Sequence, residues 1–259
     1  MTAALIYHDI APIGAQDEYG FPGPVAARYK LEPARFEEHL DAIASLRVSV
    51  GLIGDRPQAA LTFDDGGASA LGAAEALERR GWRGHFFVTT GRVGTPGFLS
   101  ADEVRELSRR GHDVGSHSDS HPTYMGSLSR AELATEWRRS REVLGEILGT
   151  PPQSAAVPGG FLSEAVIGEA AGAGYRVLMT SQPSVRPRDH DGLQVHGRFT
   201  IWAATAPARA AAYARGDLPA RAEMWLAWQT KTVSKRLSPA VYEYLRRRWA
   251  QLKRPGSAL

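Results

Sequence analysis

The sequence predicts an α/β protein in which parallel strands and helices alternate and form a barrel related to the (β/α)₈ design. Short apolar or β-rich runs recur along the 259 residues, with helical patterns between them. About seven such units can be distinguished, which favours a barrel. In barrels of this kind the active site lies at the C-terminal ends of the strands.

The strands are expected where short apolar runs end in turn residues. These runs are Ala3–His8, Ala59–Phe63, His85–Thr89, Asp113–Gly115, Ser154–Val157, Tyr175–Met179 and Gln194–Thr200. Two helices should begin with capping boxes, in which a Ser is followed three residues later by Glu: Ser100 with Glu103, and Ser129 with Glu132. Gly111 and Gly149 have the position of helix stops.

A long proline- and glycine-containing loop, from Asp9 to about Glu32, follows the first expected strand. Loops of this length are usually functional or disordered. Because it follows a strand, we expect it on the active-site face, where it would cover the substrate. The expected domains are a barrel over residues 1–205 and a basic helical extension, packed on the barrel, over residues 206–259.

The amino-acid composition limits the chemistry that the protein can perform. The chain has no cysteine, so disulfides and thiolate chemistry are excluded and any metal must be bound by His, Asp or Glu. The N-terminus lacks a basic signal-like region and no apolar run approaches the ~20 residues that span a bilayer. A cytoplasmic protein is therefore expected.

Charge is distributed unevenly along the chain. Residues 211–259 carry a balance of +7, so that −4 remains for residues 1–210. A helix is expected from Ser238 and Pro239, with basic residues around an apolar stripe. We expect it to pack on the barrel with a solvated basic face; the alternative is peripheral contact with an anionic membrane. Nucleic-acid binding is not expected, because no recognition motif accompanies these charges.

Two adjacent carboxylates, Asp64 and Asp65, directly follow an expected buried strand and precede Gly66. Buried carboxylates are costly unless something neutralises them. The same residues are also typical of a turn, and one Asp could cap the following helix.

Two histidines, His117 and His121, follow the next but one strand. Four residues apart, they would lie on one side of a helical turn, and two imidazole nitrogens could reach one ion at ~2.0–2.1 Å. A pair of surface or helix-cap histidines is the alternative.

The two motifs lie at strand ends in one β/α series, so both should face the same end of the barrel. Two histidines and one carboxylate make a three-ligand site that keeps positions open for water, as catalytic sites do. The second carboxylate can then act as a general base on that water.

These motifs resemble those of the polysaccharide deacetylase (NodB-homology) family, carbohydrate esterase family four. The resemblance is carried by Thr62-Phe63-Asp64-Asp65-Gly66, His85-Phe86-Phe87-Val88 and Gly111-His112-Asp113-Val114-Gly115-Ser116-His117-Ser118-Asp119-Ser120-His121-Pro122, over roughly residues 59–180. It implies a distorted (β/α)₇ barrel of the NodB-homology type and one divalent metal ion, zinc or another. It also implies that Asp64 is the base and that Asp65, His117 and His121 bind the metal.

The chain departs from this family in its later motifs. Where the family has an arginine that orients the base, Ala156 stands, and Arg198 is a candidate replacement. Gly159 replaces an aromatic residue, and its backbone N–H could serve the oxyanion. Tyr7, on the expected first strand, completes the candidate substrate-binding residues. The general acid is expected at His196 or at His8.

The leading hypothesis is a carbohydrate N-deacetylase that removes an N-acyl group, usually acetyl, from a small glycoside, a nucleotide-linked sugar or a lipid-linked sugar. One alternative is a metal-free barrel glycosidase in which Asp64 works with another carboxylate. The other is a protein that binds the metal without turnover.

Overall fold

The computed structural model describes residues 1–160 and 162–237. Its strands form one sheet, in the order β7-β8-β6-β5-β4-β3-β2-β1-β9. The strands are β1 (Ala3–Tyr7), β2 (Ala59–Phe63), β3 (His85–Val88), β4 (Asp113–Ser116), β5 (Ser154–Ala156), β6 (Val177–Met179), β7 (Arg188–His190), β8 (Leu193–His196) and β9 (Arg198–Thr200). Neighbouring strands pair in parallel except β7 and β8, which are antiparallel.

The sheet closes on itself through Gly197, the residue between β8 and β9. Before it the chain pairs with β6, and after it the chain pairs with β1. A side chain at Gly197 would bring its Cβ within 2.3 Å of the Gln182 carbonyl oxygen, so only glycine allows this change of partner. The expected strand Gln194–Thr200 is therefore two short strands, and the result is the predicted distorted barrel of parallel strands.

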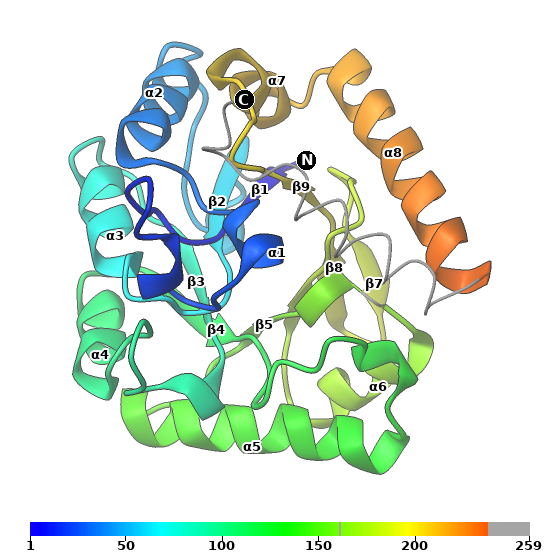
Figure 1. Ribbon diagram of the computed structural model, residues 1–259. Coiled ribbons are helices and arrows are strands. Elements are labelled where there is room, and N and C mark those ends of the chain that lie inside the picture. The colour runs from blue at the N-terminus through cyan, green and yellow to red at the C-terminus, as the bar shows by residue number, and fades with distance from the viewer. Residues whose placement is uncertain (161, 238–259) are drawn as a thin grey trace.

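Helices surround the strands, as Figure 1 shows. They are α1 (Pro24–Ala27), α2 (Pro33–Ala44), α3 (Ala70–Glu78), α4 (Ala101–Arg109), α5 (Arg130–Leu148), α6 (Glu164–Gly172), α7 (Pro207–Arg215) and α8 (Leu218–Leu237). Both expected capping boxes are confirmed, at the starts of α4 and α5. Gly149 ends α5 with a φ of 76°, a conformation that glycine adopts at little cost.

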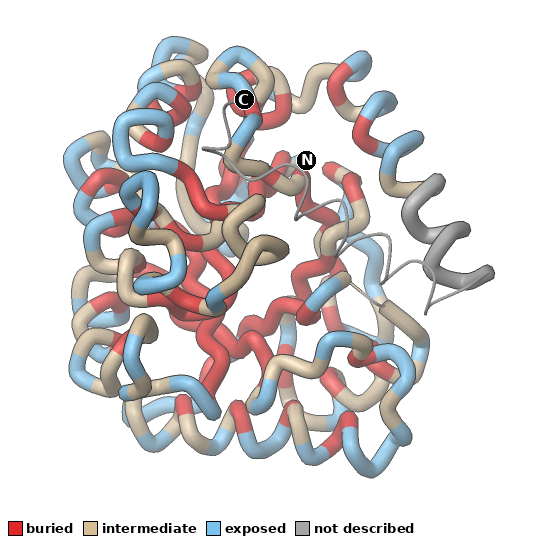
Figure 2. Tube along the Cα trace, viewed as in Figure 1, coloured by how far each residue is buried: buried red, intermediate tan, exposed pale blue. Residues whose placement is uncertain are grey.

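Side chains fill the interior of the barrel below the pocket, which opens at the C-terminal ends of the strands. Every residue of β1 and β2 is buried, as expected for parallel strands covered on both faces, and Figure 2 shows buried residues concentrated along the strands. Inside, Phe87, Ala156 and Met179 form an apolar cluster. At the N-terminal ends of β3 and β4, the His85 ring contacts the Asp113 carboxylate at 2.7 Å.

Several segments differ from expectation or extend it. The long loop Asp9–Glu32 contains a 3-10 turn, η1 (Gln16–Glu18), and the short helix α1. Strand β7 was not predicted because its side chains are mostly exposed and show no apolar alternation. In the C-terminal extension α7 packs on α2 and β1, whereas the helix expected from Ser238 lies outside the described residues. None of the described helices is long and apolar enough to cross a membrane.

Candidate active site

The two adjacent aspartates at the end of β2 face the same pocket, although consecutive residues of a strand normally point to opposite faces. Asp64 continues the strand direction and points into the barrel. Asp65 has a φ of 79°, a left-handed conformation that few residues other than glycine adopt. This local strain turns the second carboxylate toward the first, and such strain is typically retained where function requires it.

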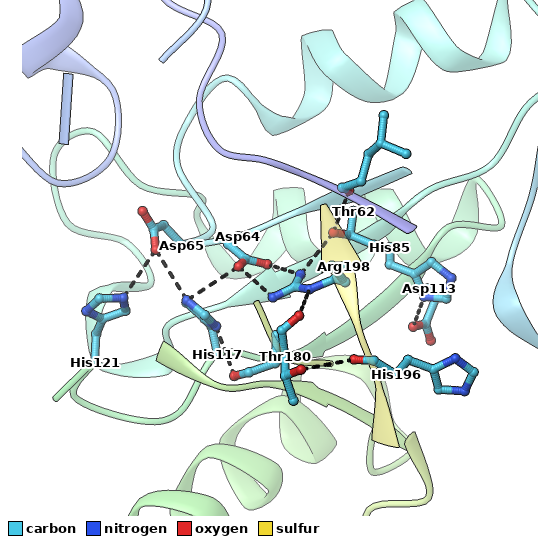
Figure 3. A network of polar contacts seen from close by, with 12 residues as sticks. Thr62, Asp64, Asp65, His85, Asp113, His117, His121, Thr180, His196 and Arg198 are labelled. Atoms are coloured by element: carbon cyan, nitrogen blue, oxygen red, sulfur yellow. Dashed lines mark hydrogen bonds and ion pairs between the residues drawn. The ribbon is translucent and has the colours of Figure 1, made fainter. Parts of the chain in front are cut away.

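The two histidines converge on Asp65, as Figure 3 shows. The Nε2 atoms of His117 and His121 each lie 3.4 Å from Asp65 Oδ1. The expectation that both sit on one helical turn is wrong. Ser118 and His121 have φ values of 62° and 58°, so a bent loop rather than a helix directs the rings to one point.

The residues present fit a divalent metal ion. One ligand atom from each of Asp65, His117 and His121 lies within 4.8 Å of the other two. The Nδ1 of His117 lies 3.0 Å from the Ala156 carbonyl oxygen. As the donor in that bond, Nδ1 keeps the proton and leaves the Nε2 lone pair facing Asp65. Metal-binding histidines are commonly oriented by such a bond from their other ring nitrogen. Two imidazoles and a carboxylate match a catalytic zinc site.

The charges at this point are consistent with a cation site. Burial raises the pKa of Asp65, but contacts with His117 and His121 lower it more, to well below its usual value. Burial lowers the pKa of His121, but the nearby Asp65 and Asp64 raise it more. Asp65 is therefore ionised in the pocket, which is the form in which a carboxylate binds a metal ion.

Arg198 on β9 forms a bidentate ion pair with the Asp64 carboxylate. Its Nη1 and Nη2 donate to Asp64 Oδ1 and Oδ2 at 2.6 and 2.9 Å. Nη1 also donates to Thr62 Oγ1 at 2.9 Å, and Nε to the Thr180 carbonyl at 3.3 Å. The guanidinium thus reaches Asp64 from β9, two strands from β2 in the sheet, and not from the position of Ala156 on β5.

This pair sets the ionisation of Asp64. Burial raises the pKa of the carboxyl, but the charge of Arg198, followed by that of His117, lowers it by more. Asp64 is therefore ionised at neutral pH, its orientation is fixed, and it does not need to bind the metal. These are the properties of a general base.

The two candidate acids lie in different places. His8 lines the pocket, and its ring is tilted against that of Tyr29 with 4.8 Å between centroids. Its Nδ1 is buried without a hydrogen-bond partner among the described residues. His196 does not line the pocket. In Figure 3 its ring points away from the metal-binding side chains, toward the part of the network that contains His85 and Asp113. Only His8 therefore stays a candidate acid.

The expectation that Tyr7 contacts the substrate is also wrong, because Tyr7 does not line the pocket. Its ring packs on Phe36 and Phe63, at centroid distances of 5.4 and 5.6 Å, in the core between β1 and α2. Strand alternation explains this position, because Tyr7 and His8 point to opposite faces. Gly159 does line the pocket, with a φ of 62° in the turn Pro158–Gly160. Its role toward an oxyanion stays a prediction.

The pocket has a volume of about 370 Å³, and much of its wall comes from residues that the sequence did not single out. The loop after β1 contributes Phe21, Pro22, Val25, Ala26, Tyr29 and Lys30. The Phe21 ring lies 4.6 Å from that of His121. The expected position of this loop on the active-site face is confirmed, although its length alone gave no way to select these residues.

Comparison with known proteins agrees with this geometry. Residues 53–178 match the sequence profile of polysaccharide deacetylases. Residues 53–178 therefore form a polysaccharide deacetylase domain. A chitin deacetylase from Colletotrichum lindemuthianum is 28% identical over 124 residues, which are 47% of this chain and 50% of that protein. The chain spans about half the length of the curated relatives that it matches.

Solved structures of deacetylases share the fold. One from Bacillus cereus superposes with a TM-score of 0.69 and 22% identity, covering 82% of this chain and 68% of that one. The Streptococcus pyogenes deacetylase PplD, in complex with acetate, has a TM-score of 0.66 and 20% identity, covering 80% and 94%. The distorted barrel predicted for this deacetylase family is therefore confirmed.

Proposed function

We propose that this protein is a metal-dependent hydrolase that removes an N-acyl group, most simply acetyl, from an amino sugar. The observation that carries the proposal is the convergence of Asp65, His117 and His121 beside the ionised Asp64 in one pocket. The match of residues 53–178 to polysaccharide deacetylases supports the reaction type, and acetate is present in the Streptococcus pyogenes deacetylase structure.

Asp65, His117 and His121 would hold the ion, and zinc suits two imidazoles and a carboxylate. A divalent ion bound there would polarise the acyl carbonyl and lower the pKa of water. Asp64 would accept a proton from the attacking water at a carboxylate oxygen that Arg198 keeps in position. Attack at the amide carbon then leads to cleavage of the C–N bond.

The departing amine needs a proton, and His8 is placed to supply it. Burial lowers the pKa of His8, although the nearby Asp65 and Asp64 raise it in part. The two carboxylates favour the protonated ring that burial disfavours, and a proton taken up there would be given up readily to the amine. His8 lines the pocket, and its buried Nδ1 has no hydrogen-bond partner among the described residues that would hold the ring in another orientation.

The loop over the pocket favours a short saccharide or a chain end as substrate. A volume of about 370 Å³ is near the lower end for ligand pockets. The loop is tied down by Lys30, whose Nζ donates to the carbonyls of Gln16, Tyr19 and Phe21. A fixed wall on one side of the pocket hinders a long polymer from lying across it. Free, nucleotide-linked and lipid-linked amino sugars are the substrates to compare.

The test is acetate release from N-acetylglucosamine as the monosaccharide, as a hexamer and as its nucleotide- and lipid-linked forms, with and without a chelator. We expect release that the chelator abolishes and that Asp64→Asn reduces by at least 100-fold. Release that survives both changes would contradict the mechanism. Binding of one metal ion without release from any of these substrates would instead favour the metal-binding protein without turnover.

The glycosidase alternative has little structural support. It needs two carboxylates, one of which acts as acid and the other as base or nucleophile. Within the described part of the chain, the carboxylates that line the pocket are Asp64 and Asp65. The first is paired with Arg198 and the second with two histidines, so neither is placed as a protonated acid.

A further inference from the structure

The loop that carries both metal-binding histidines has an unfavourable backbone conformation. Ser118 and His121 have φ values of 62° and 58°, and neither is glycine. Such residues persist only where their surroundings hold them. On the inner side the backbone N–H groups of Thr90 and Gly91 donate to the carbonyls of Ser118 and Asp119, at 3.2 and 2.8 Å. The opposite, outer side of the loop is held by helix α5, which follows it in the chain.

On that outer side one carboxylate, Glu136 on α5, accepts three hydrogen bonds. Its Oε2 accepts from the backbone N–H groups of Asp119 and Ser120, at 3.0 and 2.8 Å. Its Oε1 accepts from the Ser120 hydroxyl at 2.6 Å. Asp119 and Ser120 lie in a bend outside any helix or strand, so Glu136 satisfies backbone donors that regular structure does not.

A second contact comes from the same face of α5, one turn later. The hydroxyls of Ser140 and Ser116 are hydrogen-bonded, and residues four apart on a helix lie on the same side. Ser116 Oγ in turn accepts from the backbone N–H of Ser118 at 3.0 Å. The helix therefore holds the loop both at its start and in the middle of the segment between the two histidines.

We propose that Glu136 is a positioning residue for the metal site, which it stabilises by fixing the loop between His117 and His121. Its carboxylate contacts backbone and hydroxyl donors on the outer side of the loop, so it acts on the ion through His121. The proposal rests on the metal site of the proposed function. Loss of a direct hydrogen-bond partner of a metal ligand typically lowers metal affinity by about 10–100-fold. Glu136 contacts the residues between the ligands, so we expect an effect near the lower end of this range.

The experiment compares Zn²⁺ affinity, measured by competition with a chromophoric chelator, in the full chain and its variants. Glu136→Ala removes all three bonds and should weaken binding by about 10-fold. Glu136→Gln keeps an amide oxygen for the two N–H groups and an amide N–H₂ that can donate to the Ser120 hydroxyl. It should therefore bind within about threefold of the original protein. The matched control is Glu142→Ala, an exposed glutamate on the same helix, which should bind unchanged.

Two further measurements separate positioning from general instability. The absorption spectrum of the Co²⁺-substituted protein should change in Glu136→Ala and be restored in Glu136→Gln. If Glu136→Ala does not fold, Glu136→Asp, which is one methylene too short, should show the loss. Unchanged affinity in the Ala or Asp variant, or equal loss in Ala and Gln, would overturn the inference. Failure of the original protein to bind one Zn²⁺ per chain would instead overturn the proposed metal site.

Discussion

Replacing Arg198 by methionine tests how the base is held. The guanidinium is 1% exposed and Asp64 is 6% exposed, so the variant leaves a buried carboxylate without its main partner. Breaking a buried ion pair from one side typically costs about 3–5 kcal/mol. In a domain of this size that corresponds to a fall in Tm of roughly 10 °C. The bonds to Thr62 and to the Thr180 carbonyl would also be lost.

The assay is chemical denaturation of a double-mutant cycle with Asp64→Asn. Removing both partners no longer buries an unpaired charge, so the double variant should lose less stability than the two single variants together. Arg186→Met, at an exposed position, is the control and should change the free energy of unfolding by less than about 0.5 kcal/mol. Strict additivity of the two single losses, or a loss under about 1 kcal/mol in Arg198→Met, would refute this account of the pair.

Three further outcomes follow. His8→Gln should lower kcat for acetate release by about 10²–10⁴-fold, whereas His196→Gln should change it less than about fivefold; the reverse ranking would reassign the acid. Burial lowers the pKa of His196 to about 4, and it also lowers the pKa of His39. The unfolded chain therefore binds protons that the folded chain refuses, and Tm should fall as pH decreases from about 6.5 toward 4; a flat Tm profile would contradict this. Lys30→Met should speed proteolysis between residues 12 and 29 and raise KM for the monosaccharide, and unaltered cleavage and KM would show that Lys30 does not anchor the loop.

The four central residues of the site can be located from the sequence because parallel β/α units bring their strand ends to one face. Asp64, Asp65, His117 and His121 each follow a strand, so topology alone brings them together. The local geometry was less predictable. A spacing of four residues fits a helical turn, and nothing in the sequence indicates that non-glycine residues take left-handed conformations.

The errors in the remaining site residues have separate causes. Strand alternation could have excluded Tyr7, since His8 was the inward-facing candidate. The division of the expected strand at Gly197, next to His196, depends on a close approach to Gln182, which pattern alone does not show. Glu136 was missed because its partners are 16 and 17 residues away, on the far side of the loop.

The central claim is that one divalent ion, held by Asp65, His117 and His121, is required for hydrolysis of an N-acetylated sugar. The most direct measurement is a titration of metal-depleted protein with Zn²⁺, in which bound metal and acetate release are recorded on the same samples. We expect release to rise in proportion to occupancy and to level off at one ion per chain. Release that is already complete in the metal-depleted protein, or that does not follow occupancy, would contradict the account.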